Sequence, residues 1–199
     1  YEIYNEPQEF IQTFAEMIEY SRNHSSVIIW SLANESDFEK TYGFRKEYLY
    51  VKETDTTRPV IFSYPETVAS DPLPYDIFSW HYANIASAPL GKEEMPVLHD
   101  EFAHIPCYNL DELGQENSSR VIWGDSIRTG WEKLMQTDGA LGCALWGAVD
   151  DIFSLPENVP ERHQRHSWGK SAGYGAWGAV LDQYGREKPE AYLTKKAFS

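Results

Sequence analysis

Short apolar segments that alternate with longer helical segments limit the folds open to this chain of 199 residues more than any other feature. Five apolar segments are too short for typical helices, which favours buried strands. They span residues 26–32, 58–62, 75–80, 95–99 and 140–146, and the first is expected to be buried on both faces. We predict helices at residues 9–22, 40–53, 118–136 and 189–198, and a loop of about 35 residues before the last of them.

Alternating strands and helices favour a parallel α/β sheet with right-handed crossover connections. Five strands fit either an open doubly wound sheet or the second part of an eight-stranded (β/α)8 TIM barrel. No glycine-rich phosphate-binding loop follows any predicted strand, which weakens the nucleotide-binding version of the doubly wound fold.

In a TIM barrel the reacting groups lie at the carboxyl ends of the strands. Four predicted strands bring carboxylates, imidazoles, a phenol and an indole to that rim. These are Asn34 and Glu35 after the first strand, His81 and Tyr82 after the third, His99 to Glu101 with His104 after the fourth, and Trp146 at the end of the fifth. Two carboxyl groups suit glycoside hydrolysis, in which one protonates the leaving oxygen and the other acts below the sugar ring. Glu35 and Glu101 are the candidates, because each directly follows a predicted buried strand.

Two strings resemble segments of glycoside hydrolase family 2, which includes β-galactosidases, β-glucuronidases and β-mannosidases. Residues 22–36 (RNHSSVIIWSLANES) resemble the acid/base segment, although Ser25 and Ala33 stand where the family usually has Pro and often Gly. Residues 96–104 (PVLHDEFAH) resemble the segment that carries the nucleophile. The resemblance implies that Glu35 is the acid/base, that Glu101 is the nucleophile and that Asn34 binds the sugar 2-hydroxyl.

Further strings extend the resemblance in the family's order over nearly the whole chain. They are residues 55–60 (DTTRPV), 76–83 (DIFSWHYA), 144–151 (ALWGAVDD) and the tail from 174 to 199. The implied substrate-binding residues are Asn34, His81, Tyr82, His104 and Trp146, with Trp146 as the floor of the sugar site. A phenol from Tyr82 that donates to Glu101 would favour the ionised nucleophile.

The resemblance implies that residues 1–199 are the C-terminal part of a catalytic barrel. We expect a partial barrel that comprises strands 4–8, without strands 1–3 and without the β-sandwich domains that precede such barrels. The implied activity is that of a retaining exo-β-glycosidase with a covalent glycosyl-enzyme intermediate. β-Galactosidase is the first choice, because the string from Glu101 to His104 is closest to that version. β-Glucuronidase and β-mannosidase specificity stay open, as do a fragment that is inactive without the missing strands and an unrelated α/β binding module.

Two other motifs point to different chemistry. Asn5-Glu6-Pro7 matches the acid/base motif of other barrel glycosidases, but only four residues precede it and they leave no room for a buried strand. His99 and Glu101, followed by Cys107, resemble part of a zinc deaminase pattern, although Leu110 occupies the position of its second cysteine. We therefore interpret Glu6 as part of a loop that leads into a helix, and His99 as a histidine at a strand end.

The net charge of −14 argues against nucleic acid and anionic membranes as partners, because no basic patch is available to neutralise phosphates. The expected partners are a carbohydrate substrate and a second copy, or another chain, at exposed barrel edges. No cofactor is expected, although the resemblance allows Mg²⁺ beside the acid/base in a full-length enzyme. We expect Cys143 to be a buried free thiol. The bacterial cytoplasm, the periplasm and secretion all stay open as locations.

Overall fold

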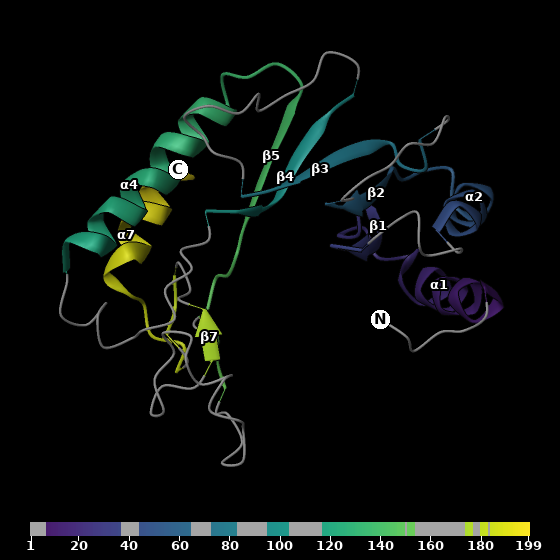
Figure 1. Ribbon diagram of the computed structural model, residues 1–199, viewed down its shortest axis with the longest axis horizontal. Coiled ribbons are helices and arrows are strands. Elements are labelled where there is room, and N and C mark those ends of the chain that lie inside the picture. The colour runs from purple at the N-terminus through teal and green to yellow at the C-terminus, as the bar shows by residue number, and fades with distance from the viewer. Residues whose placement is uncertain are drawn as a thin grey trace, which may run out of the picture. The chain divides into compact units, whose positions relative to one another are not determined.

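The computed structural model describes residues 7–36, 44–64, 73–82, 95–103, 117–149, 151–153, 174–176, 180–182 and 184–199. They form a five-stranded sheet in the order β1-β2-β3-β4-β5 and a separate pair, β6 and β7 (Figure 1). The strands are β1 (Trp30–Asn34), β2 (Val60–Ser63), β3 (Ile77–His81), β4 (Val97–Phe102), β5 (Ala140–Leu145), β6 (Asp151–Phe153) and β7 (Tyr174–Ala176). The helices are α1 (Pro7–Ser21), α2 (Phe44–Thr54), α4 (Asn117–Leu134) and α7 (Pro189–Ala197).

Neighbouring strands of the larger sheet run in the same direction. β1 pairs with β2, and β2 with β3, in parallel register. The amide of Phe78 donates to the carbonyl of Pro96 at 2.9 Å, and the amide of Tyr82 donates to that of Glu101 at 2.9 Å. Residue numbers increase in the same direction in both strands, so β3 and β4 are parallel. The predicted parallel α/β sheet is confirmed, and the carboxyl ends of these strands form one edge of it.

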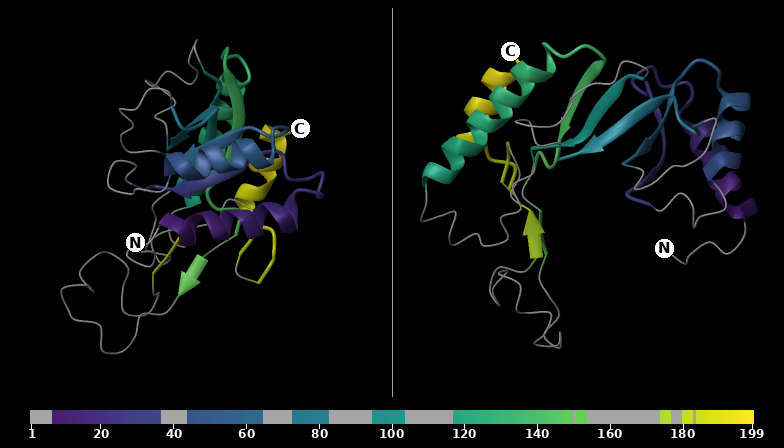
Figure 2. Two further views of the ribbon diagram at one scale, coloured as in Figure 1. Left: turned by 90° about the vertical axis from the view of Figure 1, so that its right-hand side faces the viewer. Right: turned by 45° about the horizontal axis from the view of Figure 1, so that its top comes forward.

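The chain divides into two compact units, the first made of Tyr1–Trp80 with Gly91–Leu98 and the second of His81–Leu90 with His99–Ser199. In the first unit α1 and α2 lie side by side, and α2 contacts β1 and β2 (Figure 2). Its core consists of buried apolar residues from these elements and the loop before β3: Phe14, Ile18, Trp30, Leu32, Phe44, Val51, Val60, Phe62 and Tyr75. Phe14 and Ile18 are spaced four residues apart, which predicts that they share one face of the first helix, and both are buried in this core.

In the second unit α4 packs against α7 and β5. Trp123, Ile127 and Ala197 form its buried cluster. Gly124 allows the two helices to approach closely, because a Cβ at this position would lie 2.4 Å from Cδ1 of Leu193. The core of this unit therefore depends on the absence of a side chain at residue 124.

The first predicted strand is wrong at its start and in its burial. The segment 26–32 was expected to be buried on both faces, but β1 begins at Trp30, and Ile28 is 69% exposed. Burial then alternates, with Trp30 and Leu32 buried and Ser31 exposed. The physical reason is Arg58, whose guanidinium donates to the carbonyl oxygen of Val27 at 2.6 Å, so a side chain binds this segment before strand pairing begins.

The spacing of apolar residues in the helix predicted at 118–136 assigns six of them to its inner side: Ile122, Trp123, Ile127, Trp131, Leu134 and Met135. The buried face of α4 is narrower than this. Trp123, Ile127 and Leu134 are buried, whereas Ile122 is 64% and Met135 66% exposed. A helix turns by about 100° per residue, which places Ile122 and Met135 on either side of the stripe that the buried residues form. Their assignment to the inner face is therefore wrong.

Two further findings concern β5 and the segment that follows it. β6 and β7 form a short antiparallel pair within the stretch that the sequence predicted as a loop. Strands of three residues are too short to produce a readable alternation of apolar and polar residues. Cys143 is a half-buried free thiol, and burial raises its pKa to about 12, which makes it a poor nucleophile at neutral pH.

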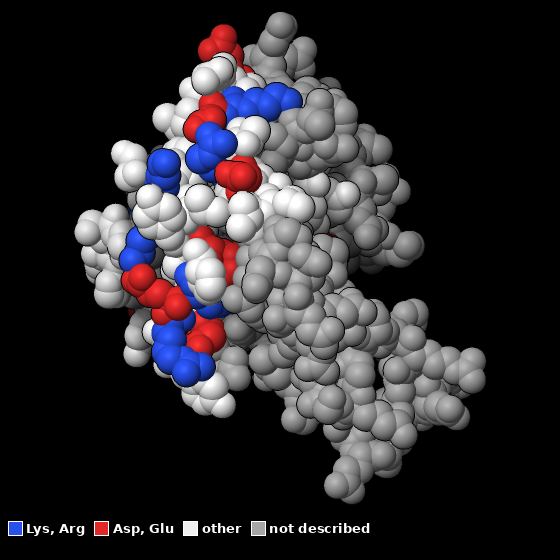
Figure 3. Space-filling model, turned by 90° about the vertical axis from the view of Figure 1, so that its left-hand side faces the viewer, with Lys and Arg blue, Asp and Glu red and all other residues white. Residues whose placement is uncertain are grey.

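Charged side chains of both signs are interspersed over the face that includes α4 and α7 (Figure 3). Arg128 lies 2.7 Å from Glu132, and Arg186 lies 2.6 Å from Asp182. Among the described residues on this face, acidic side chains therefore lie beside basic ones. Among the residues that the structure describes, no helix combines the length and the apolar character needed to cross a bilayer.

The buried carboxyl group of Glu47 on α2 should make the free energy of unfolding depend on pH. The side chain is fully buried, and neither carboxyl oxygen has a hydrogen-bond partner among the residues that the structure describes. Burial raises its pKa from 4.5 to about 7. The unfolded chain releases this proton near pH 4.5, whereas the folded chain keeps it until about pH 7. The free energy of unfolding should therefore fall by about 3 kcal/mol as the pH rises through this window.

Glu47→Gln removes the titrating group, so the variant should lose this part of the pH dependence in urea unfolding between pH 4.5 and 7.5. Glu53→Gln, at an exposed position on the same helix, is the matched control and should behave as the wild type. An unchanged pH profile in Glu47→Gln would show that Glu47 is not protonated in the folded chain.

Candidate active site

The first four strands of the sheet end in the same backbone conformation. The residue directly after each of these strands has a positive φ: 45° at Glu35, 47° at Tyr64, 47° at Tyr82 and 58° at Ala103. None of them is glycine, so each is strained by about 1–2 kcal/mol. Strain of this kind is concentrated at functional sites, because the surrounding structure must hold it in place.

Tyr64 is a site candidate that the sequence analysis missed. It follows β2 just as Glu35 follows β1 and Tyr82 follows β3, and 38% of it is exposed. Its amide donates to Oγ of Ser79 at 2.8 Å. Its position could have been found from the sequence, because residues that follow the second predicted strand lie at the same rim as those that follow the other strands.

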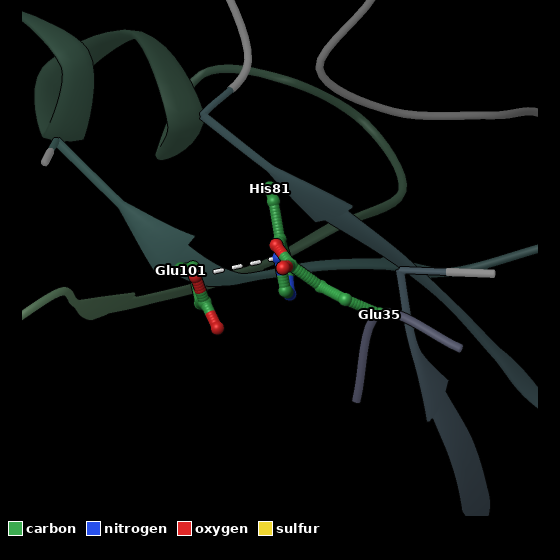
Figure 4. Close-up of side chains that lie close together, drawn as sticks. All are labelled: Glu35, His81 and Glu101. Atoms are coloured by element: carbon green, nitrogen blue, oxygen red, sulfur yellow. Dashed lines mark ion pairs between the residues drawn. The ribbon is translucent and has the colours of Figure 1, made fainter. Parts of the chain in front are cut away.

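Glu101 is a buried carboxylate at this edge. It lies within β4, and only 9% of the residue is exposed. The Tyr82 hydroxyl donates a hydrogen bond to its Oε2. Nδ1 of His81 lies 3.4 Å from the same oxygen, as the dashed line in Figure 4 marks. The predicted contact between Tyr82 and Glu101 is present in the structure.

His81 lies between two carboxylates. Its Nε2 is 3.4 Å from Oδ1 of Asp100, and the side chain of His81 is 1% exposed. Its ring meets the Tyr82 ring edge to face, with the centroids 5.7 Å apart. Asp100 was not singled out from the sequence, because nothing in the pattern of β4 distinguishes it from any other partly exposed strand residue.

Asn34 and Glu35 lie at the end of β1, in the first unit. Ser63, at the end of β2, donates from its Oγ to Oδ1 of Asn34 at 2.9 Å. Its carbonyl accepts from the amide of Glu35, also at 2.9 Å. With Oδ1 used as an acceptor, the Asn34 amide nitrogen is the group available to donate to a ligand hydroxyl. Ser63 therefore positions both Asn34 and Glu35. The sequence alone does not reveal this role, because it depends on the register of β1 against β2.

Only some of the other residues that the sequence pointed to lie within the described part of the chain. Trp146 follows β5, is 43% exposed, and donates from its amide to the carbonyl of Phe102 at 3.1 Å. His104 lies outside the described residues, as does Cys107 of the zinc pattern. His99 is fully buried and meets the ring of Phe102 edge to face. It lies inside β4 and not at its end as predicted, because the strand continues to Phe102.

The geometry at Glu101 suits a carboxylate that attacks. Within the described residues, both partners of its side chain approach Oε2. These two contacts at one oxygen fix the plane of the carboxylate. Oε1 takes part in neither of these two contacts.

Residues 5–106, about half of the chain, match the sequence family described as glycosyl hydrolases family 2, TIM barrel domain. The chain belongs to this family. A β-galactosidase of Yersinia pestis is 31% identical over 179 residues, which are 83% of this chain and 15% of that protein.

Solved structures show the same fold. A family 2 β-galacturonidase from Eisenbergiella tayi, bound to galacturonate, superposes with a TM-score of 0.66 at 19% identity, over 96% of this chain and 36% of that one. A β-glucuronidase of Faecalibacterium prausnitzii gives 0.65 at 19% identity, over 98% and 35%. The chain thus spans about a third of these solved chains and 15–16% of the first curated relatives. The parallel sheet is therefore part of a family 2 TIM barrel.

The strain at Tyr64 can be measured with a pair of variants. Tyr64→Gly and Tyr64→Ala both delete the side chain, so they differ only in the Cβ that a positive φ disfavours. We expect the Gly variant to have the higher free energy of unfolding, by about 1 kcal/mol.

Tyr192, which is exposed in the middle of α7, is the matched control. There the order should reverse, with the Ala variant more stable than the Gly variant by about 1 kcal/mol. Equal stabilities of the two Tyr64 variants in urea unfolding would contradict the strained conformation.

Proposed function

We propose that this protein is a retaining β-glycosidase in which Glu101 is the nucleophile and Glu35 the acid/base. The observation that carries the proposal is the buried carboxylate of Glu101, whose Oε2 is bound by Tyr82 and faced by His81. Family membership supports it, and so does the place of Glu35 after β1 at the carboxyl edge of the same parallel sheet.

In the first step Oε1 of Glu101 attacks the anomeric carbon while the bond from that carbon to the leaving oxygen breaks. Glu35 gives its proton to the leaving oxygen, so the aglycone departs as a neutral alcohol. The product of this step is a glycosyl ester of Glu101. The hydrogen bond from Tyr82 orients the carboxylate for this attack.

In the second step a water molecule attacks the same carbon, and Glu35, now ionised, takes a proton from it. The ester bond breaks and Glu101 recovers its charge. The exposed position of Glu35 suits this role, because the group must exchange protons with solvent species twice in each cycle. The amide nitrogen of Asn34 would donate to the sugar 2-hydroxyl, an interaction that strengthens in the transition state.

The proposed substrate is a β-galactoside, because the curated relatives are β-galactosidases. The solved β-galacturonidase and β-glucuronidase keep uronic acid substrates open as the second candidate class. Trp146, with 43% of its surface exposed, offers an aromatic face for a sugar ring. The chemistry uses these side chains and water. A Mg²⁺ ion beside the acid/base stays a prediction, as does the association of copies through sheet edges.

Turnover of nitrophenyl β-galactoside, β-glucuronide and β-mannoside tests both the activity and the sugar. We expect turnover of the galactoside, and Glu101→Gln should lower it on the order of 10⁴-fold, because an amide cannot form the ester. Glu132→Gln, exposed on α4, is the control and should retain full activity.

Glu35→Ala separates the two roles. An activated leaving group needs little acid help, so this variant should form the intermediate and then stall without its base. Added azide should restore turnover and yield a β-glycosyl azide. Activity unchanged in Glu101→Gln would overturn the assignment, and a folded chain without any turnover would favour the inactive fragment.

A further inference from the structure

We propose that Asp100 is a positioning residue that orients the nucleophile through His81. This inference rests on the proposed function of Glu101. All three residues belong to the second unit and to the adjacent strands β3 and β4. The juxtaposition forms a chain of carboxylate, imidazole and carboxylate.

The two nitrogens of His81 bridge the two carboxylates. Nε2 lies 3.4 Å from Oδ1 of Asp100, and Nδ1 lies 3.4 Å from Oε2 of Glu101. The nitrogens sit on opposite sides of one rigid ring, so a rotation of the ring would break both contacts together. Asp100 therefore fixes the ring, and the ring fixes the plane of the Glu101 carboxylate.

Burial makes these contacts effective. The side chain of His81 is 1% exposed, that of Glu101 11% and that of Asp100 18%, so water competes poorly for the charged atoms. Tyr82 supports the same geometry, because its hydroxyl binds Oε2 of Glu101 and its ring packs against the ring of His81. A nucleophile that must attack one carbon atom requires this precision, since a misplacement of about 1 Å can cost on the order of 10²-fold in rate.

The arrangement also changes the interpretation of His81. The sequence predicted it as a substrate-binding residue. Both ring nitrogens face carboxylates of the protein, so a positioning role explains its burial and its two contacts. Asp100, which the sequence did not single out, then becomes the outer end of the chain that holds Glu101.

The first test does not depend on activity. The ¹⁵N resonances of the His81 ring are compared in the wild type, Asp100→Ala and Asp100→Asn. The Nε2 resonance should shift in Asp100→Ala and return toward the wild-type position in Asp100→Asn, which keeps an oxygen acceptor at the same place. Asp138→Ala, at an exposed site in the same unit, should change nothing. A His81 spectrum that is unchanged in Asp100→Ala would overturn the proposal.

The second test follows Glu101 itself with dinitrophenyl 2-deoxy-2-fluoro-β-galactoside. Glu101 displaces dinitrophenolate and forms a stable ester with the fluorosugar, which mass spectrometry locates. In Asp100→Ala the labelling rate at saturating reagent should fall on the order of 10²-fold, whereas the half-saturating concentration changes less than about twofold. Asp100→Asn should recover most of the rate, which a loss of general stability would not allow.

The two proposals fail differently. Labelling of Asp100→Ala at the wild-type rate contradicts the role of Asp100 and leaves the proposed function standing. A wild-type chain that takes no label at Glu101 contradicts the proposed function, and the His81 resonances then decide alone whether Asp100 holds the ring.

Discussion

The geometry of the first unit depends on the hydrogen bonds that the guanidinium of Arg58 donates. It donates to the carbonyl oxygens of Val27 and Arg22 at 2.6 and 2.8 Å, and to the carboxylate of Asp55 at 2.6 Å. Asp55 in turn accepts the indole hydrogen of Trp30 at 2.9 Å. The Thr57 hydroxyl, more than any other group, holds the pKa of Asp55 well below its usual range, so the carboxylate stays charged beside Arg58. This buried cluster joins the segment before β1 to the segment before β2, and it thereby fixes where the two strands begin to pair.

Asn34 and Glu35 lie at the far end of that pairing. Trp30 pairs with Val60 and Ser31 with Ile61, and a register shift between Ser31 and Asn34 then places Ser63 opposite Asn34. Ser63 thereby reaches the Asn34 side chain and the amide of Glu35. In the second unit, pairing at the ends of β3 and β4 brings the amide of Tyr82 to the carbonyl of Glu101 and its hydroxyl to the Glu101 carboxylate. Each unit thus holds one of the two proposed catalytic carboxyl groups at a strand end. The strained residues at these ends persist because strand pairing and side-chain hydrogen bonds hold them in place.

Much of this arrangement could be predicted from the sequence. Apolar segments and their spacing gave the parallel sheet and the helices, and the rule that barrel chemistry lies at strand ends pointed to Glu35 and Glu101. The roles of Asn34, Tyr82 and Trp146 came from the family resemblance. What the sequence could not give are contacts between residues far apart in the chain. The late start of β1 depends on Arg58, and the role of Asp100 depends on the register that brings His81 beside β4. Local patterns carry no information about either contact.

The central claim is that Glu35 and Glu101 act on opposite sides of one glycosidic bond with a covalent intermediate. The anomeric form of the first sugar released from a β-galactoside tests this most directly, and ¹H NMR at early times can measure it. Two displacements at the same carbon restore the original configuration, so the β-anomer should appear first and the α-anomer only later, as the free sugar equilibrates. An α-anomer that appears first would mean a single displacement by water, and it would contradict the assignment of Glu101 as the nucleophile.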